Sequence, residues 1–208
     1  ERRRREGIAA HDAAERLRRV IDAGYLDDAL LARMLAWRDE LVGRDLGVIG
    51  LLLDAEYAAA NAQYRTTVLK YREFAAKGGF RLPFDGAPFR YNYAVALQRL
   101  GYQREALEVA SGLREHPRVG TPARRLVFLA ADQINRDQPG SANRAQLTRA
   151  ARDFLAVAPD DADAAFAHLA LAGGDDADAA THLAAARRDA RTRGAVQRAR
   201  LDAAVAAF

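Results

Sequence analysis

The sequence predicts an all-α protein made of consecutive antiparallel helix pairs. Ala, Arg, Leu and Asp dominate the 208 residues while β-branched residues are sparse, and this composition favours helices. Apolar residues recur every three or four positions in most segments, which places them on one helix face. Gly and Pro fall mainly between these periodic segments, where they end helices.

Residues 89–117 form the clearest pair. The first apolar run ends at Leu100-Gly101, because Gly readily adopts the backbone angles that close a helix. The second run stops before Pro117, which cannot continue a helix. The small side chains of Ala94 and Ala106 sit where two antiparallel helices would approach closely. The apolar positions of the two runs are Tyr93, Ala94, Leu97, Leu100 and Ala106, Leu107, Ala110, Leu113.

With Ala94, Leu100-Gly101, Ala106 and Pro117 in these places, the stretch resembles a tetratricopeptide repeat, a helix-turn-helix unit of about 34 residues. It departs from the family at Gln103, where an aromatic is usual, and Pro117 comes one place early. The resemblance is closest in this unit and looser elsewhere. It implies a right-handed superhelical array whose first helices line a concave groove, and a protein-interaction scaffold.

The turn glycines Gly24, Gly101 and Gly174 are spaced so that each interval holds about two such repeats. We therefore predict a single repeat domain over residues 1–208, in about five pairs and a C-terminal helix. Because the chain begins at Glu1 and not at Met, we expect a piece of a longer protein. The predicted pairs are 8–42, 45–79, 88–117, 121–159 and 162–190, followed by a terminal helix at 192–208.

Several local expectations follow from this layout. The turn of the second pair is hidden in an Ala-rich run at 58–62, after which Tyr64, Val68, Tyr71 and Phe74 share a helix face. Residues 80–88 are irregular, and their two phenylalanines predict a connector that packs onto the array, with a functional loop as the alternative. Residues 135–143 predict an enlarged turn. Trp37 is expected in the core or, alternatively, as an anchor for a partner.

The chemistry of most enzymes is missing from the sequence. There is no cysteine, which excludes disulfides and thiol catalysis, and there is no phosphate-binding loop or serine nucleophile elbow. The acidic clusters at 160–163 and 175–178 lack the Gly and Glu of a calcium loop and are expected to cap helices. His168 and His182 lie on the two helices of one pair, but a metal site would need a further ligand. We predict no catalytic residue, no metal and no cofactor.

The resemblance implies which residues face the groove. In the 88–117 pair these include Asn92, whose equivalent grips the peptide backbone in peptide-binding members, and Arg99, which suits a carboxylate. The charged set of chaperone-tail clamps is not complete, so a cochaperone is disfavoured. The predicted binding residues are Tyr91, Asn92, Val95, Gln98, Arg99 and His168.

We expect a non-catalytic scaffold that binds a protein or peptide segment. The Ala/Arg/Asp-rich usage is typical of high-GC bacteria, and repeats of this kind occur in periplasmic parts of polysaccharide exporters and secretion machines. This usage leans to the Gram-negative periplasm, with the cytoplasm as the alternative, and leaves the compartment open. Net charge is +4, and the Arg block at 2–5 is interpreted as an exposed, frayed terminus or, alternatively, as a contact for an anionic partner. Two alternatives to the protein-binding scaffold stay open. One is contact with an anionic polymer, polysaccharide more than nucleic acid, and the other is a regulatory domain cut from a larger enzyme. No apolar run is long enough to predict a membrane span.

Overall fold

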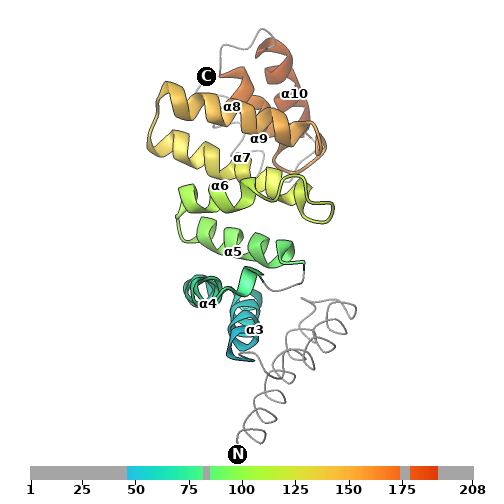
Figure 1. Cartoon of the computed structure of the whole chain (residues 1–208). Coiled ribbons are helices and arrows are strands. Elements are labelled where there is room, and N and C mark those ends of the chain that lie inside the picture. Colours follow the sequence, from blue (N-terminus) through green and yellow to red (C-terminus); the bar gives the residue numbers. More distant parts are fainter. Residues whose placement is uncertain (1–45, 82–84, 174–178, 192–208) are drawn as a thin grey trace, which may run out of the picture. The chain divides into compact units, whose positions relative to one another are not determined.

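A computed structural model describes residues 46–81, 85–173 and 179–191. In these ranges the chain forms eight α-helices and one short 3-10 helix and contains no strand, which confirms the all-α class (Figure 1). The chain divides between Gly101 and Tyr102 into two compact units. The predicted pair at 8–42, Trp37 and the terminal helix at 192–208 lie outside the described residues.

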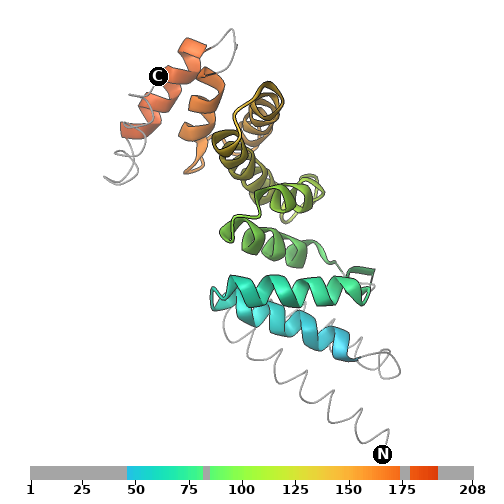
Figure 2. The same cartoon turned by 90° about the vertical axis from the view of Figure 1, so that its left-hand side faces the viewer.

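The described part of the first unit contains three α-helices and the 3-10 helix. Consecutive helices pack on each other: α3 lies along α4, and α4 contacts both η1 and α5 (Figure 2). Buried aliphatic and aromatic side chains fill the space between them, among them Leu52, Val68, Phe74, Phe89 and Leu97. The elements are α3 (Leu46–Ala60), α4 (Tyr64–Ala76), η1 (Gly79–Arg81) and α5 (Ala87–Arg99).

The turn that the sequence hides in its alanine run lies at residues 61–63. Ala62 adopts a left-handed backbone conformation with φ of 55°, and the side-chain amide of Asn61 donates to the carbonyl of Tyr57, 2.8 Å away. A left-handed residue at a helix end is usually glycine, because any Cβ is crowded there. An alanine at this position makes the turn difficult to recognise in the sequence.

Replacing Ala62 by glycine is expected to stabilise the protein by up to about 1 kcal/mol, since relief of the left-handed strain exceeds the extra entropy of an unfolded glycine. Urea unfolding followed by circular dichroism measures the change. Ala59→Gly is the matched control, because Ala59 lies inside α3 and the same substitution should cost about 1 kcal/mol there. A loss of stability in Ala62→Gly would contradict the strained turn.

The described part of the connector before α5 packs onto the first unit through Phe80, whereas the second phenylalanine, Phe84, lies outside the described residues. The Phe80 ring lies 5.0 Å from the ring of Phe74, edge to face, and 6.2 Å from that of Tyr71. The guanidinium of Arg90 lies over the Phe80 ring, 4.9 Å from its centroid. Phe80 is thus held between α4 and the first turns of α5, which fixes the start of α5.

The described part of the second unit contains five helices, each packed on the next in the chain. The stacked rings of Phe128 and Phe154, 5.7 Å apart, are fully buried between α7 and α8. The buried residues of this unit include many alanines, among them Ala123, Ala130, Ala151, Ala164, Ala165 and Ala167. The helices are α6 (Gln103–Ser111), α7 (Gly120–Asp137), α8 (Ser141–Leu155), α9 (Ala164–Ala172) and α10 (Ala179–Arg191).

The turn predicted at 135–143 is shorter than expected, because α7 continues to Asp137 and α8 begins at Ser141. Side-chain contacts hold this last turn of α7: Arg136 pairs with Asp132 at 2.5 Å, and Gln133 donates to Asp137 at 2.8 Å. Such contacts between residues four apart extend a helix beyond what the polar sequence suggests.

The stretch at 89–117 is helical on both sides of its turn. Gly101 has φ of 84°, which confirms the predicted helix end, and Ala94 and Ala106 are fully buried. The second helix, α6, ends at Ser111, earlier than Pro117 suggested. The two helices belong to different units, α5 to the first and α6 to the second. Their packing as one tetratricopeptide-like pair stays a prediction.

Candidate partner-binding face

The first turn of α5 is fixed by local sequence. The carboxylate of Asp85 accepts a hydrogen bond from the backbone N–H of Ala87 at 3.0 Å, which satisfies a helix amide that has no partner within the helix. Pro88 lies in the first turn, where its missing N–H costs nothing. Phe89, Ala94 and Leu97 are buried along the helix, which packs on α4 and α3.

The remaining surface of α5 carries five of the six predicted binding residues. We call Tyr91, Asn92, Val95, Gln98 and Arg99 the α5 face. Arg99 is exposed, while the other four are half-buried. The sixth predicted residue, His168, lies on α9 in the second unit.

Asn92 is bonded to its own chain. Its amide nitrogen donates to the Oε2 atom of Glu56 on α3 at 2.9 Å. The hydroxyl of Tyr71 on α4 donates to the other carboxyl oxygen, Oε1. We call Glu56, Tyr71 and Asn92 the Glu56 cluster. It joins α3, α4 and α5, so the α5 face is supported from behind by a polar contact.

The carboxyl of Glu56 is 1% exposed, and this burial raises its pKa to about 8, while the hydrogen bond from Asn92 opposes the shift. A buried carboxylate is costly because it loses its hydration, so the neutral acid is favoured. Glu56 is therefore largely protonated at neutral pH. Its Oε1 then carries the hydrogen and donates to the Tyr71 oxygen, whereas the ionised carboxylate accepts from the Tyr71 hydroxyl. Because Glu56 and Tyr71 are both closed off from solvent, the cluster is a tie between helices and offers no acid or base to a substrate.

Sequence reasoning missed Glu56. A signal exists, since Glu56 lies four residues after Leu52 and three after Leu53, both buried, and so falls on the apolar face of α3. A charged residue at such a position calls for buried polar partners. Tyr71 was expected on a buried helix face, but its hydrogen bond to Glu56 was not.

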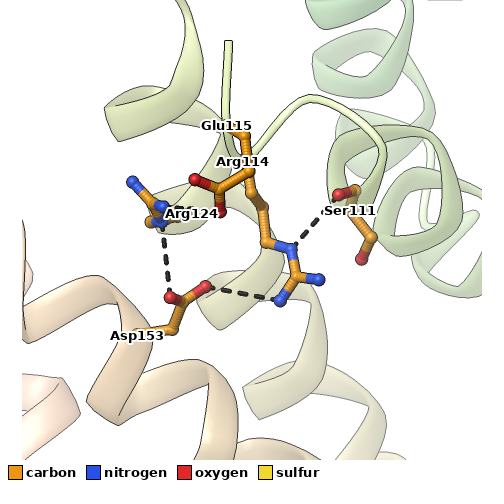
Figure 3. A network of polar contacts seen from close by, with 5 residues as sticks. All are labelled: Ser111, Arg114, Glu115, Arg124 and Asp153. Atoms are coloured by element: carbon orange, nitrogen blue, oxygen red, sulfur yellow. Dashed lines mark hydrogen bonds and ion pairs between the residues drawn. The ribbon is translucent and has the colours of Figure 1, made fainter. Parts of the chain in front are cut away.

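The second unit contains a charged network between α7 and α8 (Figure 3). Asp153 lies 3.3 Å from Nε of Arg124 and 3.4 Å from Nη1 of Arg114. Arg124 also pairs with Glu115 at 2.8 Å, and Nε of Arg114 donates to the carbonyl of Ser111. Figure 3 shows the two guanidinium groups directed at one carboxylate. These arginines are thus engaged within the chain.

The acidic cluster at 160–163 is engaged in the same way. Arg125 lies 2.6 Å from Asp163 and 3.3 Å from Asp161, and Asp161 accepts a hydrogen bond from the backbone N–H of Asp163. Asp163 directly precedes α9, where a carboxylate also favours the positive end of the helix dipole. Asp163 occupies the N-cap position of α9 but makes no side-chain capping hydrogen bond there, so the capping bond expected from sequence is not seen and the two carboxylates pair with Arg125 instead. The other cluster, at 175–178, lies outside the described residues.

His168 is half-buried and faces His182 of α10. Their Nδ1 atoms are 3.1 Å apart, and their ring centroids are 5.3 Å apart. In the described ranges no group of three or more His, Asp or Glu side chains is placed to hold a metal ion. No described helix is long and apolar enough to cross a membrane.

Comparisons with protein-family models, with curated proteins and with solved structures give no match. The likeness to tetratricopeptide repeats therefore stays a resemblance of sequence pattern, closest in residues 89–117. Function has to be inferred from the side chains that the two units present.

Proposed function

We propose that the chain is a non-catalytic scaffold that binds an extended segment of a partner protein along the α5 face. The observation that carries this proposal is the mixture of groups on that face. Tyr91 and Val95 provide apolar area, Gln98 an amide and Arg99 an exposed guanidinium, all within three turns of one helix. Aromatic and arginine side chains over a packed support are typical of binding hot spots.

The support behind the α5 face favours binding. Phe89 and Leu97 are buried beneath it, Asn92 is tied to Glu56, and Phe80 holds the first turns. A helix fixed in this way loses little conformational freedom when a partner binds, so more of the contact energy appears as affinity.

Arg99 indicates the chemistry of the segment. An exposed guanidinium binds a carboxylate through two parallel hydrogen bonds, so we expect an acidic residue in the partner beside an apolar one. A contact surface for an anionic polymer is less well supported, because Arg114, Arg124 and Arg125 of the second unit are already paired with acidic side chains. This proposal includes tetratricopeptide-like pairing of the helices, which the pattern of residues 89–117 supports. It also includes a place in a bacterial envelope assembly, which the amino-acid composition supports.

Peptides selected on the wild-type chain from a random phage-displayed library are expected to lose roughly tenfold or more in affinity for Arg99→Glu, since the charge reversal removes the guanidinium and repels the acidic residue. Fluorescence anisotropy of labelled peptides measures the affinity. Arg65→Glu is the matched control, because Arg65 is exposed on α4 and undergoes the same charge reversal away from the α5 face. Asn92 is left intact, since its loss would expose the Glu56 cluster.

Equal affinity of the selected peptides for wild type and Arg99→Glu would show that the α5 face is not the binding site. Heparin and a single-stranded dT oligonucleotide serve as anionic probes in the same assay. Tight binding of either probe that falls steeply with added salt would favour a surface for an anionic polymer over a peptide-binding α5 face.

A further inference from the structure

The two histidines of the α9–α10 pair face each other through the same ring nitrogen. We propose that His168 and His182 form a binding site for a divalent late first-row transition-metal ion, with both Nδ1 atoms as ligands. This site is independent of the α5 face and its proposed function, since the two histidines belong to the second unit.

The separation of the two nitrogens suits one shared metal ion. With metal–nitrogen bonds of about 2.0–2.1 Å, neighbouring ligands lie about 3.3 Å apart in a tetrahedral site and about 2.9 Å apart in a square-planar site. The Nδ1 atoms of His168 and His182 are 3.1 Å apart, between these two values. The separation fits one shared ion, and to bind it each ring has to turn so that its Nδ1 lone pair points at the ion and no longer at the other ring.

Without a metal, the same distance is a hydrogen bond in which the Nδ1–H of one neutral ring donates to the bare Nδ1 of the other. Metal binding needs a lone pair on both Nδ1 atoms. The Nδ1 proton leaves to solvent and a proton is taken up at Nε2 of the same ring, so both imidazoles stay neutral and the pair gains only the charge of the ion. Acid opposes binding, because protons compete with the metal for the ring nitrogens.

Packing places the two rings in advance. His168 lies three residues after Ala165, and His182 lies four residues before Ala186, so each ring extends the side of its helix that is buried in the α9–α10 core. Leu169 is buried in the same core, and Leu183 packs against it. Both rings stay half-buried at the edge of this core, which leaves them accessible to an ion.

Within the described ranges no third His, Asp or Glu is placed with the two rings to hold an ion. A closed structural zinc site has four protein ligands, whereas two imidazoles with water give an exchangeable ion. Imidazole ligands suit copper, nickel and zinc, and Cu²⁺ is expected to bind most tightly of the three.

Titration calorimetry of the tag-free chain with CuCl₂, NiCl₂ and ZnCl₂ tests the proposal. We expect one ion per chain, with affinity reduced roughly tenfold or more in His168→Gln and in His182→Gln, because one imidazole alone is a weak ligand. His116→Gln is the matched control, since His116 lies in the same unit and its Nδ1 already accepts from the backbone N–H of Arg118. The melting temperature should rise with the metal in wild type and in the control only.

Absence of binding to the wild-type chain, or wild-type affinity in both variants, would overturn the site. Should either variant fail to fold by circular dichroism, long-range ¹⁵N NMR of the wild-type chain with ZnCl₂ decides. Zinc-dependent shifts at Nδ1 of both His168 and His182 support the site, and shifts at Nε2 or none at all overturn it.

Discussion

Raising the pH from about 5 to about 8 is expected to lower the free energy of unfolding of the first unit by roughly 1.4 kcal/mol per pH unit, and Glu56→Gln is expected to remove this dependence. The pKa of Glu56 is raised from an ordinary 4.5 to about 8 by burial. Between these values the folded state holds a proton that the unfolded state has lost, so stability falls as pH rises. The contribution of protonated Glu56 to stability is complete at a pH below 4.5 and is lost at a pH above about 8.

The Glu56→Gln variant would keep the shape of the protonated acid. The oxygen of the new amide can accept from Asn92 and its nitrogen can donate to the Tyr71 oxygen, so the tie between the helices survives without a titrating group. Urea unfolding at a series of pH values, followed by circular dichroism, measures the slope. Glu73→Gln is the matched control, because Glu73 is exposed on α4 and pairs at the surface with Lys70. A pH slope that persists in Glu56→Gln would exclude Glu56 as its source.

Phe154→Ala is expected to destabilise the second unit by about 3–5 kcal/mol, through lost burial and the cavity that remains between α7 and α8. Phe154 is fully buried and stacked on Phe128, which would lose its aromatic neighbour as well. Urea unfolding measures the loss, and hydrogen exchange should locate it in α7 and α8.

Val157→Ala provides the comparison, since Val157 lies three residues further along and is 39% exposed. Its truncation should change stability by less than about 0.5 kcal/mol. Equal effects of the two substitutions would mean that the stacked rings are not the centre of this unit.

The sequence predicts the helices of the described ranges well because their evidence is local. Leu100-Gly101 ends α5 as expected, and the buried Ala94 and Ala106 follow from helical spacing. Errors occur where side chains override local rules, as in the longer α7 and in the turn with Ala62 in place of a glycine.

From the sequence alone, only the outward-facing residues of the α5 face could be predicted, and the contacts that support this face could not. Spacing places Tyr91, Val95 and Arg99 on one helix, but the partner of Asn92 is Glu56, 36 residues earlier in the chain. Local periodicity shows that Glu56 is an acidic residue on an apolar helix face. Only the packing of three helices shows that Tyr71 and Asn92 are its hydrogen-bond partners. For the same reason the sequence only places His168 and His182 on the two helices of one pair, and the structure is needed to show that their rings face each other.

The many buried alanines of the second unit determine whether its core tolerates smaller or larger side chains. At Ala130, Ala151 or Ala165 there is a single methyl group to lose, so truncation removes little. Enlargement at the same positions forces closely approaching backbones apart, which typically costs about 1–3 kcal/mol. At these alanine positions sequence drift is therefore constrained by steric crowding, whereas at the larger buried side chains, such as Phe154, Leu147 and Leu171, truncation leaves a cavity.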